Sequence, residues 1–246
     1  MKTWNKTYVA FLIASLSASI AFQTRAYALQ ADSNRIHLDD SDWWSGYTKG
    51  AGSPPVKPEN KEPALTKFKI LGVELEEPQL GVALVKIGKA TVVGRGDAST
   101  GRDQACYVSE GSEPVYLIFE NGELDSSFYL FKDDHPWHGR ELCATSGRVS
   151  KDTATDSGLK LGLARSQVEA ILGRPTASFK HWLIYSYSLE RKRPIGEFKK
   201  YLEGIPKERE KELEAQIPTW HFDLFIAVRF SSSTVDYLTV SEASED

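Results

Sequence analysis

The chain has few of the residues and motifs that most often identify an activity. Met1 is its single methionine, and only two of its 246 residues are cysteine. It contains no Gly-x-Ser-x-Gly, His-Glu-x-x-His or P-loop sequence. Beyond residue 28, no apolar run approaches the ~20 residues that are needed to span a bilayer. The sequence therefore predicts no catalytic residue, cofactor or metal ligand, although side chains far apart along the chain could still meet in a site.

The first 28 residues have the pattern of a secretory signal peptide. Lys2 and Lys6 give a basic start, an apolar run diluted by serine extends from Tyr8 to Phe22, and Ala26-Tyr27-Ala28 offers small residues for cleavage. A membrane anchor is the alternative, but the run is short for a span and no cysteine follows it for lipid attachment. We expect an exported protein, periplasmic or secreted, without a stable membrane anchor.

The mature chain is expected to be acidic. Residues 1–28 hold three of the 30 Lys and Arg residues and none of the 34 Asp and Glu residues, so 27 basic and 34 acidic side chains remain. The formal charge of the mature chain is then −7. Because such a surface repels phosphate backbones, we do not expect a nucleic acid as partner.

Cys106 and Cys143 both lie in the part expected to be exported. An even number of cysteines in an oxidising compartment favours a disulfide, with two free buried thiols as the alternative. In the chain-entropy model, a bond that closes a loop of ~37 residues stabilises the fold by roughly 3–4 kcal/mol.

Residues 29–64 are rich in Asp, Ser, Gly, Pro and Lys and are expected to form a flexible leader. Trp43-Trp44 is the exception within it, because two adjacent indoles are costly to leave in water. They are expected either to cover an edge of the folded part or to anchor a partner.

The chain becomes periodic from Phe68 onward. Apolar residues at helical spacing predict a helix at Ser166–Leu172, which Gly173 and Pro175 end. Asn121-Gly122 predicts a hairpin turn. The expected strands are Ala105–Ser109, Val115–Phe119, Ser127–Phe131, Leu142–Val149, Trp182–Ser188, Trp220–Phe230 and Val235–Val240.

A weak internal repeat suggests two similar units. Residues 87–91 (Ile-Gly-Lys-Ala-Thr) echo residues 172–176 (Leu-Gly-Arg-Pro-Thr), and Gln79–Ile87 then corresponds to the helix at Ser166–Leu172. Chance similarity is the alternative. We expect an α+β fold of two tandem helix-plus-antiparallel-sheet units, residues 65–152 and 153–246, with a charged helical insertion at 194–218.

The run Gly158–Pro175 has the pattern Gly-Leu-x-x-Gly-Leu-x-x-x-x-Val-x-x-Ile-Leu-Gly-x-Pro. It resembles the BamE/SmpA/OmlA family of small outer-membrane lipoproteins and is similar to the wider β-lactamase-inhibitor-protein superfamily. The resemblance implies helices packed on an antiparallel sheet in exported, non-enzymatic proteins that bind other proteins. The chain departs from the lipoproteins in lacking a cysteine after the signal.

Alternation within the strands indicates a candidate binding face. In the strand from Trp220 to Phe230, the even-numbered residues are apolar and are expected to pack on the helix, which leaves the odd-numbered residues on the other face. Val115, Leu117 and Phe119 are likewise expected in the core, with Tyr116 and Ile118 outward. Aromatic and Arg side chains dominate interface energetics. The expected partner-binding residues are Tyr116, Tyr129, His221, Phe225, Arg229 and Tyr237; an ordinary solvated or covered sheet face is the alternative.

The leading hypothesis is an exported, non-enzymatic protein that binds another protein through sheet faces and loops. A metal-dependent or other hydrolase is one alternative, because Asp133-Asp134-His135-Pro136-Trp137-His138 gathers ligand-type residues, although Pro136 favours a turn there. A structural component of the cell envelope is another.

Overall fold

A computed structural model describes most of the chain beyond residue 67 and two short pieces of the leader. The described residues are 35–37, 57–59, 68–75, 79–95, 101–123, 125–132, 139–192 and 219–245. The expected signal peptide, Trp43-Trp44, the run 133–138 and the insertion 194–218 lie outside them.

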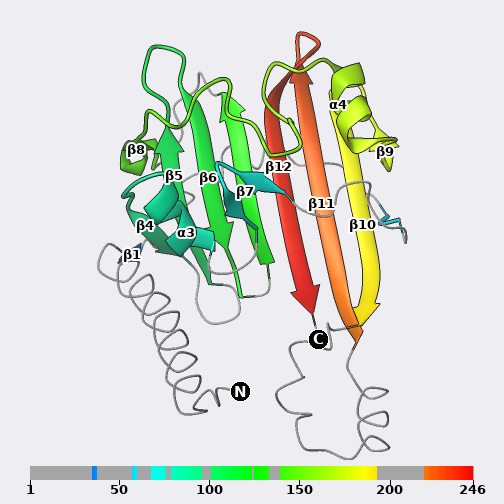
Figure 1. Cartoon of the computed structure of the whole chain (residues 1–246), viewed down its shortest axis with the longest axis horizontal. Coiled ribbons are helices and arrows are strands. Elements are labelled where there is room, and N and C mark those ends of the chain that lie inside the picture. Colours follow the sequence, from blue (N-terminus) through cyan, green and yellow to red (C-terminus); the bar gives the residue numbers. More distant parts are fainter. Residues whose placement is uncertain are drawn as a thin grey trace, which may run out of the picture.

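Ten strands form one large, mostly antiparallel sheet (Figure 1). Nine of them follow the order β1-β4-β5-β6-β7-β12-β11-β10-β9, and β8 pairs with β5. Among the described strands of this sheet, β1 with β4 and β5 with β8 pair in parallel, and the other neighbours pair antiparallel. The bounds are β1 Arg35–His37, β4 Val92–Arg95, β5 Arg102–Val108, β6 Val115–Asn121, β7 Asp125–Lys132, β8 Ala144–Thr145, β9 Ala177–Ser178, β10 Trp182–Lys192, β11 Thr219–Ser231 and β12 Thr234–Glu245.

The two described α-helices pack on the same face of this sheet (Figure 1). They are α3, Gln79–Lys86, and α4, Arg165–Leu172. A small hairpin of β2, Lys69–Ile70, and β3, Val73–Glu74, contributes to the same core. α4 lies where apolar spacing predicted a helix, and α3 lies at the segment that the internal repeat matched to it. We call the side of the sheet that they cover the helix face and the opposite side the outer face.

Local contacts fix the ends of α4. The Ala164 N–H donates to Gln167 Oε1 at 2.8 Å, which satisfies one of the donors exposed by the first turn. Gly173 follows the helix with φ of 80°, a conformation that glycine adopts without a Cβ clash. At the N-terminus, Arg165 donates to the carbonyl oxygens of Phe179 and Lys180 at 2.9 and 3.1 Å and so ties α4 to the chain before β10.

The core on the helix face is continuous across the whole sheet. One cluster of buried residues contains Leu84 from α3, Leu117 and Leu130 from β6 and β7, and also Leu238 and Val168 from β12 and α4. The halves of the chain therefore share one hydrophobic core.

The expectation of an α+β fold made of two tandem units, each with its own sheet, is wrong. β7 and β12 pair antiparallel over seven positions, from Tyr237 with Phe131 to Ala243 with Asp125, and join the strands of both halves into one ten-stranded sheet. If the sheet stopped at either strand, a long row of N–H and C=O groups would be left at an exposed edge. Their pairing removes both edges and places them at the centre.

The disulfide between Cys106 and Cys143 is confirmed. The expected strand at Leu142–Val149 is mostly absent, because the chain forms a short 3-10 helix at Arg140–Leu142 and then pairs only Ala144 and Thr145 with β5. The bond holds this segment beside Cys106 on β5, where Leu142 and Cys143 pack on the outer face.

Candidate protein-binding face

Aromatic side chains form a row across the outer face. Cross-strand pairing places Tyr116 opposite Phe131, Phe131 opposite Tyr237, and Tyr237 opposite Arg229. The ring centroids of Tyr116 and Phe131 are 5.4 Å apart and stacked, and those of Phe131 and Tyr237 are 6.1 Å apart. Trp182 of β10 meets Tyr237 edge to face at 5.9 Å. We call Tyr116, Phe131, Tyr237 and Trp182 the aromatic row.

Arg229 lies within this row. Its guanidinium carbon is 5.6 Å from the centre of the Tyr237 ring, a distance at which a cation is attracted by the ring's negative face. The guanidinium also donates to both carboxylate oxygens of Asp236, at 3.1 and 2.9 Å. This bidentate pair fixes the direction of the planar group.

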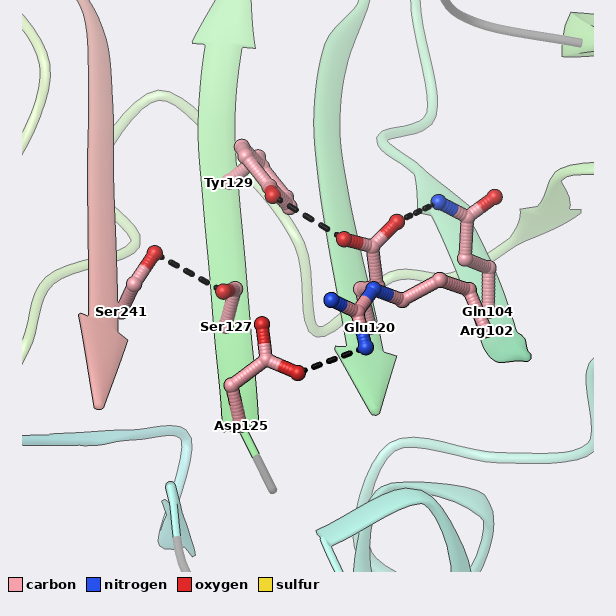
Figure 2. A network of polar contacts seen from close by, with 7 residues as sticks. All are labelled: Arg102, Gln104, Glu120, Asp125, Ser127, Tyr129 and Ser241. Carbon is pink, nitrogen blue, oxygen red and sulfur yellow. Dashed lines mark hydrogen bonds and ion pairs between the residues drawn. The ribbon is translucent and has the colours of Figure 1, made fainter. Parts of the chain in front are cut away.

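A polar network crosses the same face closer to the ends of β6 and β12 (Figure 2). Glu120 accepts hydrogen bonds from Gln104 Nε2 and from the Tyr129 hydroxyl, the latter at 3.3 Å. Ser127 and Ser241 are hydrogen-bonded at 2.8 Å across β7 and β12.

The surroundings of this network strongly favour the protonated form of Tyr129. Burial raises the pKa of the Tyr129 hydroxyl well above its ordinary value of 10, and Glu120 and Tyr237 raise it further. Tyr129 therefore stays protonated throughout the physiological pH range, donates a hydrogen bond to Glu120 and adds no charge to the face.

One corner of the outer face is accessible. His221 and Asp223 are exposed, and Phe225 and Ser241 are half-buried. Register places Phe225 beside Ser241 and Ser186, and His221 beside Glu190 and Glu245. We call His221, Asp223, Phe225 and Ser241 the open corner: an aromatic ring with acidic residues and a histidine close by.

The six residues expected to bind a partner all belong to the outer face of this one sheet. They differ in accessibility: His221 is exposed, whereas Tyr129, Phe225 and Arg229 are half-buried. Tyr116 and Tyr237 are only 4% and 3% exposed. Tyr116 and Ile118 lie on the outer side of the sheet, opposite Val115, Leu117 and Phe119, and both are buried there.

Sequence reasoning missed Phe131, Trp182 and Glu120 on this face. For β6 a signal was present, because Val115-Tyr116-Leu117-Ile118-Phe119 is a continuous apolar run, which is typical of a strand buried on both sides. For Glu120 the sequence held no such signal, because its partners Gln104 and Tyr129 come from two other strands.

Within the described parts of the chain, no group of three or more His, Cys, Asp or Glu residues could hold a metal ion. The candidate run Asp133–His138 lies outside these parts. No described helix is long and apolar enough to cross a membrane.

Comparisons with family models, with curated proteins and with solved structures give no match for this chain. The resemblance of residues 158–175 to the BamE/SmpA/OmlA family therefore remains a proposal.

Proposed function

We propose that this chain is an exported, non-enzymatic protein that binds another protein at the open corner of the outer face. Two observations support export. The first 28 residues read as a signal peptide, and Cys106 and Cys143 form a disulfide, which persists in oxidising compartments.

The observation that favours the open corner is the difference in burial across one face. Most outer-face residues of β6 and β7, and Ala227 of β11, are buried, whereas Phe225 at the middle of β11 is half-buried and Asp223 and His221, toward its N-terminal end, are exposed. A half-buried aromatic ring surrounded by polar groups has the anatomy of an interface anchor. Asp223, Glu190 and Glu245 lie close by in register, so we propose a partner that offers an apolar pocket with basic side chains around it.

Site-specific photo-crosslinking tests this surface in the organism that produces the protein. The photoreactive residue p-benzoylphenylalanine replaces Phe225 in one variant and Phe179, a 40% exposed residue beside α4, in the matched control. We expect a discrete adduct with a second protein from position 225 and none from position 179. The same adduct from both positions, or from neither, contradicts the proposal.

Export has its own readout. The protein recovered from the producing cells is expected to begin at Leu29 and to carry no free thiol. A protein that still begins at Met1, or one with two reactive cysteines, would contradict the proposed export.

A further inference from the structure

The disulfide between Cys106 and Cys143 holds a short segment of the chain against the outer face. This segment, Gly139–Thr145, contains the 3-10 helix and β8, and we call it the latch segment. Its residues Leu142 and Cys143 pack against a cluster of buried outer-face residues that includes Cys106 and Tyr116. The latch segment therefore covers part of this cluster.

The latch segment has little other attachment to the sheet among the described residues. Its backbone pairs with β5 at two positions, Ala144 and Thr145 (Figure 1). The hydrogen bonds that the N–H groups of Leu142 and Cys143 donate go to carbonyls within the segment and do not reach the sheet. Elements with so few long-range contacts open locally at a free energy far below that of global unfolding. The disulfide is therefore the main restraint on this segment.

The chain is held more firmly from Ser146 onward. The Ser146 N–H donates to the Val108 carbonyl at 2.9 Å, and the Ser146 hydroxyl donates to the Ile87 carbonyl at 3.4 Å. Arg148 donates to a backbone carbonyl at the end of α3. Val149 is only 2% exposed and belongs to the core on the helix face. Opening of the latch segment can therefore stop at Ser146 and leave the sheet and the helices in place.

The two cysteines of the disulfide differ in accessibility. Cys106 is 1% exposed in β5, whereas Cys143 is half-buried beside the exposed residues Arg140 and Glu141. Thiol–disulfide exchange begins when a thiolate attacks one of the two sulfurs, and access to that sulfur controls which one reacts. Attack at Cys143, with Cys106 as the leaving group, is therefore the accessible route.

We propose that the Cys106–Cys143 bond is a redox-sensitive latch, which a dithiol such as the Cys-x-x-Cys pair of a thiol oxidoreductase opens without unfolding the sheet. A thiolate of the dithiol attacks Cys143 Sγ, the bond between the two cysteines breaks, and Cys106 leaves as a thiolate. The second thiol of the dithiol then displaces Cys143 from the mixed disulfide. Two electrons pass to the protein, each cysteine takes up one proton, and the dithiol becomes a disulfide.

Reduction then frees the latch segment from the outer face and uncovers the cluster beneath it. The latch segment pairs with β5, whereas the open corner lies on β11 and β12. The inference therefore does not depend on the proposed partner.

A monothiol probe tests the site of attack. The purified, oxidised protein is treated with glutathione without denaturant, quenched with N-ethylmaleimide in urea and analysed by peptide mass spectrometry. We expect glutathione on Cys143 and maleimide on Cys106, at least about tenfold more often than the reverse. Equal or reversed labelling, or reaction only when urea accompanies glutathione, would overturn the inference.

Limited trypsin digestion distinguishes local opening from global unfolding. Arg140 lies in the latch segment and Arg148 lies outside it, and both are exposed, so they are matched cleavage sites. On addition of dithiothreitol, we expect cleavage after Arg140 to rise by about tenfold or more and cleavage after Arg148 to stay within about twofold. Equal increases at both sites, or no increase at Arg140, would overturn the inference.

A variant without the bond provides the control. Cys106→Ser with Cys143→Ser should be cleaved after Arg140 as fast as the reduced parent protein, and at the same rate with and without dithiothreitol. A rate in this variant that still depends on dithiothreitol would contradict the assignment of the effect to this bond. The glutathione experiment uses the parent protein and does not require the variant to fold.

Discussion

Arg229 and Asp236 face each other across the turn that joins β11 to β12, and two hydrogen bonds of 3.1 and 2.9 Å connect them. Each side chain is about a quarter exposed. The register between β11 and β12 shifts at Arg229 and Phe230. The Arg229–Asp236 ion pair therefore lies where the strand pairing is irregular. The ion pair thus fixes both the turn and the cation over Tyr237.

Removal of this carboxylate should destabilise the fold. We expect Asp236→Ala to lower the free energy of unfolding by about 1–2 kcal/mol, because a half-buried guanidinium loses its bidentate partner. Asp152→Ala is the control, since Asp152 forms a longer, 3.4 Å pair with Lys160 and is 70% exposed. Asp152→Ala should change the free energy of unfolding by no more than about 0.5 kcal/mol. Urea unfolding measures both; equal effects would contradict this role of Asp236.

Thr239 offers a change that should stabilise the protein. It is buried in β12, and its hydroxyl has no hydrogen-bond partner among the residues that the structure describes. Thr239→Val keeps the shape of the side chain and removes an unsatisfied polar group. We therefore expect it to raise the free energy of unfolding by about 1 kcal/mol. The matched control is Thr153→Val, because the buried Thr153 hydroxyl accepts from the Ser150 N–H at 2.8 Å. Thr153→Val should lower the free energy of unfolding by about 1 kcal/mol. A loss of stability in both variants would contradict the assignment for Thr239.

The disulfide should contribute strongly to stability. It closes a loop with a sequence separation of 37, which corresponds to roughly 3–4 kcal/mol in the chain-entropy model. Replacing Cys106 and Cys143 together by serine should lower the urea midpoint accordingly. Dithiothreitol should have the same effect on the parent protein and none on the double variant. An unchanged midpoint after complete reduction would show that the bond does not constrain the unfolded chain in this way.

Buried tyrosines should make the fold sensitive to alkali. Burial raises the pKa of Tyr107, Tyr129 and Tyr185 above the ordinary value of 10. Because these pKa values are higher in the folded state, their contribution is fully present below pH 10 and is lost as the pH rises above it. We expect stability to fall above pH 10 and Tyr129→Phe to lessen that slope, by at most about 1.4 kcal/mol per pH unit.

Absorbance at 295 nm follows tyrosinate directly. In the folded protein, these three hydroxyls should stay protonated at pH 11, while the denatured chain titrates fully near pH 10. Simultaneous titration of all tyrosines in the folded protein would show that the three are open to solvent.

Periodicity was sufficient to predict the helix at Ser166–Leu172 and the main strands, because each is a local pattern of apolar residues, while the helix at Gln79–Ile87 was predicted from its similarity to the first. It could not predict that Phe131 pairs with Tyr237, since alternation reports which face a residue occupies and says nothing about its neighbouring strand. The single sheet depends on that pairing between distant segments. The leader was expected to be flexible, yet β1 and Glu59 pair with the sheet through backbone groups, which leave no signature in side-chain pattern.

Hydrogen exchange followed by mass spectrometry tests most directly whether the strands on the two sides of the β7–β12 pairing form one sheet around one core. We expect β7 and β12 to exchange as central strands, as slowly as β6 and β11, and to lose their protection together in urea. Fast exchange of β7 and β12, at the rate of exposed edge strands, would show two separate sheets and contradict the account.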